Sequence, residues 1–566
     1  MRLAAIIFQK TFPRVLLAIL VVSFILVFDC CKPGKESQVP QEEQEEEVMI
    51  EIPLSTTTNN EEFCQLNQSV ATLADGRFGV VWEVGSFPQR DVALQMITRY
   101  GTLCFEPGGK LIANTRSDEG DAVIVAHPFS GVFVAFSQKN GNGGRRILVQ
   151  YFNDTGEPMW PGDGIVAADA VQREAQSKPT LVPDSSGGVY VCFDPSGNWD
   201  DEVKCQHLDA YGNRLWGDLG KTAGGEAGLK VFPRAIRDGT GGLLVFWRNQ
   251  RNVFVDPNQP MIMEGQHFSA DGTKLWGERG KTVKITNLAA SNGYTFRFMG
   301  VVPDINSGAV IVFNDWTQQT DAELDVVAQR VADDGSLLWG EGTVVTGDWG
   351  HQQLDAIIAA DDGGVFVVVS DQLNESENIL RIYRLGPDGQ HRWGTEGVRL
   401  SHPTDLSLDY GLSGNFDSLS NRLRLVWTRL KDSASYDFDV MAARFTGDGQ
   451  SLDTPGGITL ISAQDAQFTI AMVYSQAAGL WLAVWDDRRK SQSWDDLDVY
   501  AALVNDAFLD NQPPLFTGYQ ENAGSVNTNK KRITPGNVPV LNGLLHTRLF
   551  RLPNQAPPRL RCPQRN

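Results

Sequence analysis

The sequence predicts an all-β protein, a β-propeller of eight four-stranded blades, with seven blades as the alternative. Eight short apolar stretches each end in a bulky residue, and successive ends lie 54, 57, 54, 66, 56, 58 and 58 residues apart. The end residues are Trp82, Phe136, Phe193, Trp247, Phe313, Val369, Trp427 and Trp485. A repeat of this length, with turn signals between short strands, is typical of stacked β units such as propeller blades.

Each repeat has the same internal order of strands and turns. The third copy reads GGVYVCFDPSGNWDDEVKCQHLDAYGNRLWGDLGK, from Gly187 to Lys221. A glycine-led apolar strand is followed by a variable loop, a second strand, a tight Asp/Gly turn and a Leu-Trp-Gly stretch. Apolar stretches interrupted by such turns predict β-hairpins, and the segment before the paired glycines supplies the fourth strand.

Two markers keep the register of the repeats. Five glutamines each lie six residues before a turn glycine: Gln95, Gln150, Gln206, Gln266 and Gln329. A large aromatic stands four residues beyond each of those glycines: Phe105, Trp160, Trp216, Trp276 and Trp339. Because a blade buries its faces only against neighbouring blades, we expect these aromatics to pack between blades rather than to form a ligand cage.

The eighth copy lacks its last strand. It contains GLWLAVWDD and DLDVYAALV, but no Leu-Trp-Gly stretch follows Val504. The segment VMIEIPLS, Val48 to Ser55, has the alternating character of a strand and precedes the first complete copy. We expect it to supply the missing outer strand, which would close the ring and cover a bare sheet edge.

Residues 1–31 predict an export signal. Arg2, Lys10 and Arg14 precede an apolar run of 14 residues, Val15 to Phe28, and Cys30 and Cys31 follow it. The run is shorter than the roughly 20 residues of a membrane span. Three interpretations stay open: a lipoprotein signal with Cys30 or Cys31 lipidated, an uncleaved anchor, or a cleaved signal. All three place the protein outside the cytoplasm, in the cell envelope or at the cell surface, and the lipoprotein is the favoured one.

Composition divides the rest of the chain. Residues 32–47 form an acidic tether, 48–507 the propeller, and 508–566 a tail with eight prolines and a local net charge of +6. The formal net charge of the whole chain is −20, which argues against nucleic acid as a partner. We expect membrane contact only through the N-terminal anchor.

Two cysteine pairs are candidates for disulfides. Cys192 and Cys205 fall on consecutive strands of one predicted hairpin, and Cys64 and Cys104 flank the first blade. A bridge is sterically allowed where the registers coincide, and free buried thiols are the alternative for each pair.

No residue is assigned a catalytic role. The sequence has no GxSxG, HExxH or P-loop motif, its seven histidines are scattered, and His207 and His267 occupy equivalent repeat positions. We expect no cofactor and no metal. Paired acids such as Asp200 with Asp201 and Asp495 with Asp496 could bind Ca²⁺, but they lack the spacing of a calcium loop.

Variable loops after the second strands are the candidate binding surface. Alternate connections of an up-and-down blade lie on opposite faces, so these loops gather on one face. Variable loops on a rigid scaffold are where binding is usually found, and Trp beside Asp or Arg suits a sugar or a protein segment. The candidate ligand-binding residues are Trp199, Asp200, Asp315, Trp316, Arg488, Arg489, Trp494 and Asp495.

The xDGxxLWG stretches resemble those of large exported bacterial propeller proteins, many of which are uncharacterised. The resemblance covers Gln68 to Val504, and the seventh copy departs from it with Leu-Asp-Thr at Leu452 to Thr454. It implies a fold rather than an activity. We expect a non-catalytic binding or assembly scaffold, tethered to the envelope, whose partner is a protein or glycan there. A surface glycosidase of the sialidase-like propeller type is the alternative, although no arginine triad can be assigned.

Overall fold

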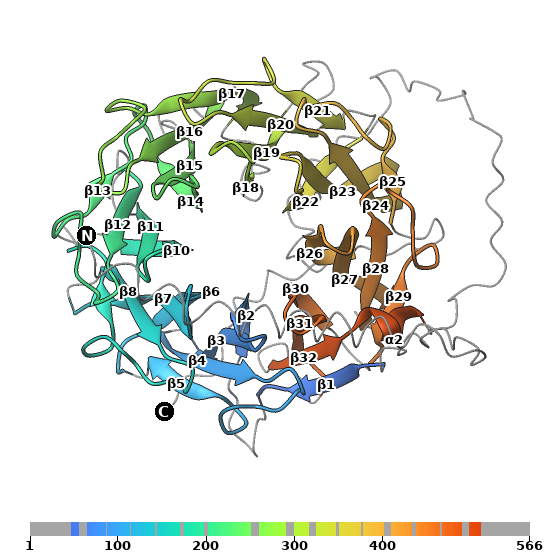
Figure 1. The fold of residues 1–566 in the computed structure, drawn as a ribbon, viewed down its shortest axis with the longest axis horizontal. Coiled ribbons are helices and arrows are strands. Elements are labelled where there is room, and N and C mark those ends of the chain that lie inside the picture. Colours follow the sequence, from blue (N-terminus) through green and yellow to red (C-terminus); the bar gives the residue numbers. More distant parts are fainter. Residues whose placement is uncertain are drawn as a thin grey trace, which may run out of the picture. The chain divides into compact units, whose positions relative to one another are not determined.

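The computed structural model describes residues 47–510, apart from 56–64, 87, 114, 142–143, 170–174, 197–201, 251–259, 290–298, 316–323, 347–349, 375–376, 401–408, 433–436, 464–466 and 490–496. Eight four-stranded blades form a β-propeller around a central channel (Figure 1). The predicted fold class and blade number are confirmed, and the seven-bladed alternative is wrong.

Blades I to IV each contain four antiparallel strands in chain order, with the first strand at the channel. Their bounds are β2 (Gln65–Thr72), β3 (Phe78–Ser86), β4 (Gln89–Ile97) and β5 (Lys110–Ala113) in blade I; β6 (Glu119–Ala126), β7 (Val132–Lys139), β8 (Arg145–Phe152) and β9 (Ile165–Val166) in blade II; β10 (Ala175–Pro183), β11 (Val189–Ser196), β12 (Lys204–Leu208) and β13 (Lys221–Thr222) in blade III; β14 (Lys230–Arg237), β15 (Leu243–Asn249), β16 (Pro260–Phe268) and β17 (Lys281–Ala289) in blade IV.

Blades V to VII repeat this order, and blade VIII takes its outer strand from the N-terminal side of the chain. Their bounds are β18 (Met299–Pro303), β19 (Ala309–Asp315), β20 (Asp325–Val331) and β21 (Thr343–Thr346) in blade V; β22 (Gln352–Ala359), β23 (Val365–Asn374), β24 (Glu377–Leu385) and β25 (Val398–Arg399) in blade VI; β26 (Asp409–Asp417), β27 (Arg422–Asp432), β28 (Asp437–Thr446) and β29 (Ile458–Ile461) in blade VII; β30 (Gln467–Ser475), β31 (Leu480–Asp487), β32 (Asp498–Val504) and β1 (Met49–Pro53) in blade VIII.

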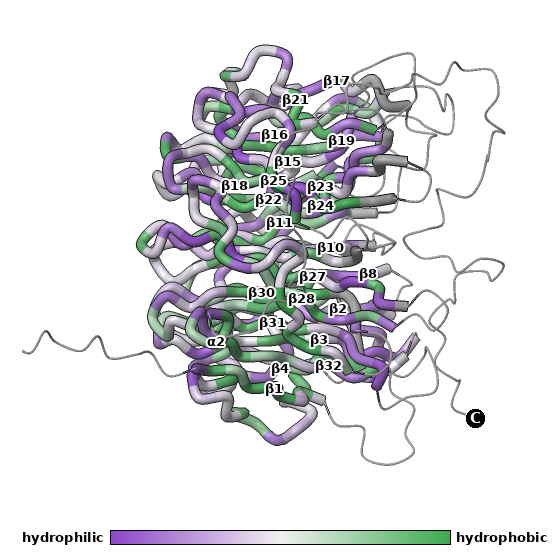
Figure 2. The backbone as a smooth tube through the Cα atoms, turned by 90° about the vertical axis from the view of Figure 1, so that its right-hand side faces the viewer, coloured by the Kyte–Doolittle hydropathy of each residue, from purple (hydrophilic) through white to green (hydrophobic). Residues whose placement is uncertain are grey.

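The hydrophobic core consists of layers between adjacent blades. One cluster joins Phe246 of blade IV to Ile311 of blade V, and another joins Ile382 of blade VI to Trp427 of blade VII. Hydrophobic residues follow the middle of the strands, and hydrophilic residues gather toward their ends (Figure 2). Each blade therefore buries its two faces against its neighbours, as a propeller requires.

The repeated aromatics and glycines meet at these interfaces. Trp216 of blade III is 4% exposed, and its indole Nε1 donates a hydrogen bond to the carbonyl of Ala270 in blade IV at 3.0 Å. A Cβ placed on Gly272 would lie 2.9 Å from that indole, and Gly272 has a φ of +82°. Trp160, Trp276, Trp339 and Trp393 donate to the next blade in the same way. The prediction that these aromatics pack between blades is confirmed.

Strand β1 closes the ring. Met49 to Pro53 pair in antiparallel register with Val504 to Tyr500 of β32, and the buried side chain of Ile52 packs among residues of blades I and VIII. The prediction that Val48 to Ser55 supplies the outer strand of the eighth blade is confirmed. Because β1 covers the outer edge of β32, blade VIII has its full set of four strands.

Blade VII departs from the repeat for a visible reason. Asp453 stands where the other blades have the interface tryptophan, and its carboxylate binds the guanidinium of Arg444 at 2.6 Å. Arg444 also donates to the backbone carbonyl of Asp506 in α2 (Asp506–Asp510), the short helix after β32. A buried ion pair and this helix thus replace the aromatic joint. None of the helices in the described part of the chain has the length and hydropathy needed to cross a membrane.

Candidate functional site

Three of the predicted loop residues are described, and none is an open binding group. Asp315 is 2% exposed, at the end of β19 and opposite Asp325 in the strand ladder. Arg488 is 9% exposed. Arg489 forms ion pairs with Asp487 at 2.6 Å and with Glu51 of β1. Strand pairing and the closure of blade VIII thus bury Asp315 and Arg488 and engage Arg489, and the assignment of these three residues to ligand binding stays a prediction.

The remaining predicted residues lie outside the described part of the chain. They are Trp199, Asp200, Trp316, Trp494 and Asp495, the acids Asp201 and Asp496 of the calcium alternative, and the lipidation candidates Cys30 and Cys31. Among the described residues, no group of three or more His, Cys, Asp or Glu side chains is arranged to hold a metal ion.

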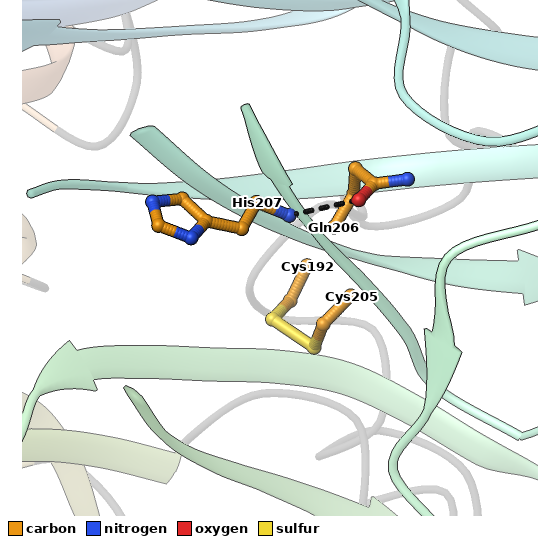
Figure 3. The surroundings of a disulfide bond; sticks show 4 residues. All are labelled: Cys192, Cys205, Gln206 and His207. Atoms are coloured by element: carbon orange, nitrogen blue, oxygen red, sulfur yellow. Dashed lines mark hydrogen bonds between the residues drawn. A yellow bond between two sulfur atoms is a disulfide. The ribbon is translucent and has the colours of Figure 1, made fainter. Parts of the chain in front are cut away.

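A disulfide joins Cys192 and Cys205 across β11 and β12, next to the repeat residues Gln206 and His207 (Figure 3). The two cysteines are direct partners in the strand ladder, with Cα atoms 4.1 Å apart. Cys104 carries a free and exposed thiol. Its suggested partner Cys64 lies outside the described residues, so the structure contains one of the two bridges considered.

The polar residues at one end of the inner strands form a repeated structural network. This end is the short-turn face, defined by the connections from each first strand to each second strand. Asp184 lies 2.8 Å from Nε2 of His207, and Asp238 lies 2.9 Å from Nε2 of His267. Arg330 binds Asp304 at 2.9 Å in blade V. His207 and His267 are therefore repeat residues, as expected.

A groove of about 690 Å³ opens on the short-turn face, between blades III, IV and V. Asp184, Asp238 and Asp304 line it, and each is already engaged by its basic partner. The groove therefore offers no acid that is available for chemistry.

The opposite end, the long-loop face, has a different feature: a β-bulge in most of the innermost strands. Register shifts occur after Gly120 in β6, Ser177 in β10, Val231 in β14, Leu354 in β22 and Tyr410 in β26. A bulge inserts an extra residue and redirects side chains, and bulges are common beside active sites. The described inner strands pair with the second strand of their own blade, and only β10 has a further partner, a single parallel pairing of Ala175 with Arg145 of β8. The bulge residues therefore adjoin the channel.

The residue at the β-bulge differs from blade to blade. Asp121, Lys178 and Phe232 take φ values of 52°, 50° and 57°, and Gly411 takes 56° at the matching position of β26. Asp355 is the extra residue of the bulge in β22. Left-handed backbone at a non-glycine residue is strained, and such strain persists mostly where function or packing demands it.

Two acids at the long-loop face hold protons at unusually high pH. Burial raises the pKa of Asp355 to about 7, against the opposing hydrogen bond from Ser370. Burial and the charge of Glu119 raise the pKa of Asp91 to about 6. Asp355 is partly exposed on the innermost strand, whereas Asp91 lies on β4, the third strand of blade I. Of the two, only Asp355 adjoins the channel.

Sequence reasoning missed the bulge residues, although a signal for two of them was present. Pro179 and Pro233 each lie nine residues before the second glycine of a Gly-Gly pair. Proline cannot donate to a strand ladder and is confined to edges and bulges. A proline at a fixed place in an otherwise apolar strand thus marks both the channel edge and the bulge.

No protein-family model matches this chain. No curated protein sequence matches it either. Several solved structures are similar in fold. An ulvan lyase, described as a new family of polysaccharide lyase, is 10% identical with a TM-score of 0.41, over 70% of this chain and 94% of its own. A protein of unknown function from Dyadobacter fermentans is 8% identical with a TM-score of 0.38, over 81% and 98%.

An α-L-arabinofuranosidase from Fusarium graminearum is 9% identical with a TM-score of 0.34, over 58% of this chain and 92% of its own. The solved neighbours with a named activity are thus enzymes, which contradicts the expectation of a non-catalytic scaffold that is more likely not an enzyme. We correct this expectation. At such low identity the likeness concerns the fold alone. The residues of this chain therefore carry the argument about activity.

Proposed function

We propose that this protein is a glycan-cleaving enzyme, a glycosidase, that acts at the long-loop end of its central channel. The observation that carries the proposal is Asp355. Its carboxyl group stands on a bulge of an innermost strand, is partly open to solvent, and has a pKa of about 7. Raised carboxyl pKa values in clefts are a mark of functional sites.

Glycoside hydrolysis requires a carboxylic acid that protonates the leaving oxygen. An ordinary aspartate is ionised at neutral pH, so the acid must be held partly protonated by its surroundings. For Asp355, burial raises the pKa, and the hydroxyl of Ser370 holds Oδ2 at 2.5 Å. The group can therefore donate a proton near pH 7 and has a fixed orientation. We assign it the role of general acid.

The test uses the purified full chain and a panel of polysaccharides and chromogenic glycosides, with release of reducing ends as the readout. Asp355→Asn is expected to lower kcat by roughly 10²- to 10⁴-fold, the usual contribution of general acid–base catalysis. Asp91→Asn is the matched control, because it changes an acid of raised pKa that lies away from the channel. It is expected to retain kcat.

The pH dependence gives a second readout. Because the acid form of Asp355 is the active one, kcat/KM of the wild type is expected to fall as the pH rises above about 7. The proposal fails if no member of the panel is cleaved, or if Asp355→Asn cleaves as fast as the wild type.

We also propose that the enzyme works outside the cytoplasm, anchored through Cys30 or Cys31. The basic and apolar N-terminal segment supports this placement, and so does the disulfide between Cys192 and Cys205, since such bonds persist in oxidising compartments. Labelling of growing cells with a fatty-acid analogue is expected to mark the wild type and not a Cys30→Ser, Cys31→Ser double variant. Equal labelling of both would refute the anchor.

A further inference from the structure

A cluster of cations lies at the long-loop end of the channel, on the bulges of blades III and IV. Lys178 and Phe232 occupy equivalent bulge positions, with φ values of 50° and 57°, and each precedes a proline. Arg234 follows on β14, and Arg248 lies opposite Val231 on β15. We call Lys178, Phe232, Arg234 and Arg248 the channel cation cluster.

The aromatic ring holds two of these cations together. The Nζ atom of Lys178 lies 3.7 Å from the centroid of the Phe232 ring, and the Cζ atom of Arg248 lies 4.9 Å from it. Both distances are within the range of cation–π attraction. The strained backbone at Phe232 thus places its ring where it draws cations from two blades toward one point.

Lys178 and Arg234 are solvent-exposed side chains, and among the described residues neither forms an ion pair with a carboxylate. On the short-turn face, by contrast, Arg330 and Arg384 bind the turn acids Asp304 and Asp362. Asp194 and Asp121 act on Lys178 only through the longer-range attraction of their charges.

The surroundings of Lys178 and Arg234 disfavour the protonated, positively charged forms of these side chains. Burial lowers the pKa of Lys178, and the charges of Arg248 and Arg234 lower it further, against Asp194 and Asp121. Burial lowers the pKa of Arg234 although its side chain is exposed. A bound anion would relieve this repulsion, and a neutral ligand would not.

We propose that the channel cation cluster binds the carboxylate or sulfate groups of an acidic glycan, with Lys178 and Arg234 making the contacts. This inference rests on the proposed function and narrows its substrate class to anionic polysaccharides. The chain carries a net charge of −20, so a polyanion would be repelled elsewhere and directed to this local site. Asp355 lies two blades further round the ring from blade IV, at the bulge of its own inner strand β22.

The test measures binding by calorimetry with the full chain carrying Asp355→Asn, so that turnover is not needed. The probes are polygalacturonate for carboxylates, dextran sulfate for sulfates, and dextran as the neutral polymer. We expect one or both polyanions to bind and dextran not to bind. Adding Lys178→Gln and Arg234→Gln is expected to weaken polyanion binding by roughly 10- to 100-fold, as the loss of charge-assisted hydrogen bonds implies.

Arg237→Gln is the matched control. Arg237 is also exposed on β14, but it lies at the short-turn end, beside the groove of blades III to V. Its replacement is expected to leave polyanion binding unchanged, and Lys178→Arg, which keeps the charge, is expected to retain it. Thermal unfolding of each variant checks the fold.

The outcomes separate this inference from the proposed function. Polyanion binding that depends on Lys178 and Arg234 supports the cation cluster even if the wild type cleaves nothing, in which case only the glycosidase proposal fails. Equal binding of dextran and the polyanions, or unchanged binding by the double glutamine variant, overturns the cluster and leaves Asp355 to its own test.

Discussion

The two ends of the innermost strands differ in how faithfully their polar residues repeat. At the short-turn end, a turn acid binds a basic residue of the third strand in four consecutive blades: Asp184 with His207, Asp238 with His267, Asp304 with Arg330, and Asp362 with Arg384. At the long-loop end, the left-handed position of the bulge carries Asp121, Lys178, Phe232 or Gly411, and the bulge of β22 has Asp355 as its extra residue.

This difference separates two kinds of constraint. A residue that recurs in blade after blade meets a need that every blade shares, which is the stability of its own turn. The residue at the β-bulge changes from blade to blade, so the shared need for a stable turn cannot explain it. The variable bulge is therefore where a ligand would be recognised, because function is carried by sites added to a fold.

The largest effect is expected at the repeated end. Asp238→Ala removes the acceptor for the backbone N–H groups of Thr240 and Gly242, each within 2.8 Å, and for His267. Because Asp238 is 2% exposed, the loss should lower the free energy of unfolding by about 2–4 kcal/mol. Asp184→Ala is expected to do the same. Urea unfolding measures both, and unequal losses would break the equivalence of the blades.

A smaller effect of opposite sign is expected at the variable end. The pKa of Asp355 is raised from 3.8 to about 7, so the folded state binds more protons between these values. Its stabilising contribution is complete below pH 3.8 and is lost as the pH rises through about 7. Asp355→Asn should therefore stabilise by about 1–2 kcal/mol at pH 8, after discounting for solvent access, and by little at pH 4.5. A gain independent of pH would contradict this account.

The smallest effect compares backbone strain at the two ends. Ser307 has a φ of +62° in a turn where Gly187 and Gly363 occupy the same place in other blades. Ser307→Gly should stabilise by about 0.5–1 kcal/mol, because glycine adopts this conformation freely. Lys178→Gly relieves similar strain but should also weaken polyanion binding. If neither or both of these variants affected binding, the distinction between the ends would not hold.

Much of the fold could be predicted because its determinants are local and repeated. The spacing of Gln206, Gly212 and Trp216 reflects one hairpin: the side-chain carbonyl of Gln206 accepts from the backbone N–H of Trp216 at 2.9 Å. The same spacing recurs in other copies, so the repeats of this one sequence can be compared with one another. Cys192 and Cys205 could be named as a candidate pair for the same reason, with free thiols as the alternative, and the structure shows that they face each other across one hairpin.

The candidate site could not be predicted in this way. Lys178 and Arg248 come from two blades and meet at the ring of Phe232 only when these blades have packed together. Asp355 looks like any strand aspartate in the sequence, and its raised pKa comes from its burial in the folded protein. From the sequence we expect Arg489 to be an exposed loop residue. In the structure it forms an ion pair with Glu51 of β1, a strand that is distant in sequence and adjacent in space.

The sequence by itself determined the repeat, the strand order within each blade and the segment that closes the ring. The first two features depend on contacts within a hairpin or between consecutive copies, which residue spacing encodes directly. The closing segment could be identified because the last copy lacks a strand and Val48 to Ser55 has the pattern of one. Only the tertiary structure decided which polar residues are paired and which adjoin the channel. Burial, desolvation and the meeting of charges depend on how adjacent blades pack in three dimensions, and no spacing along the chain records them.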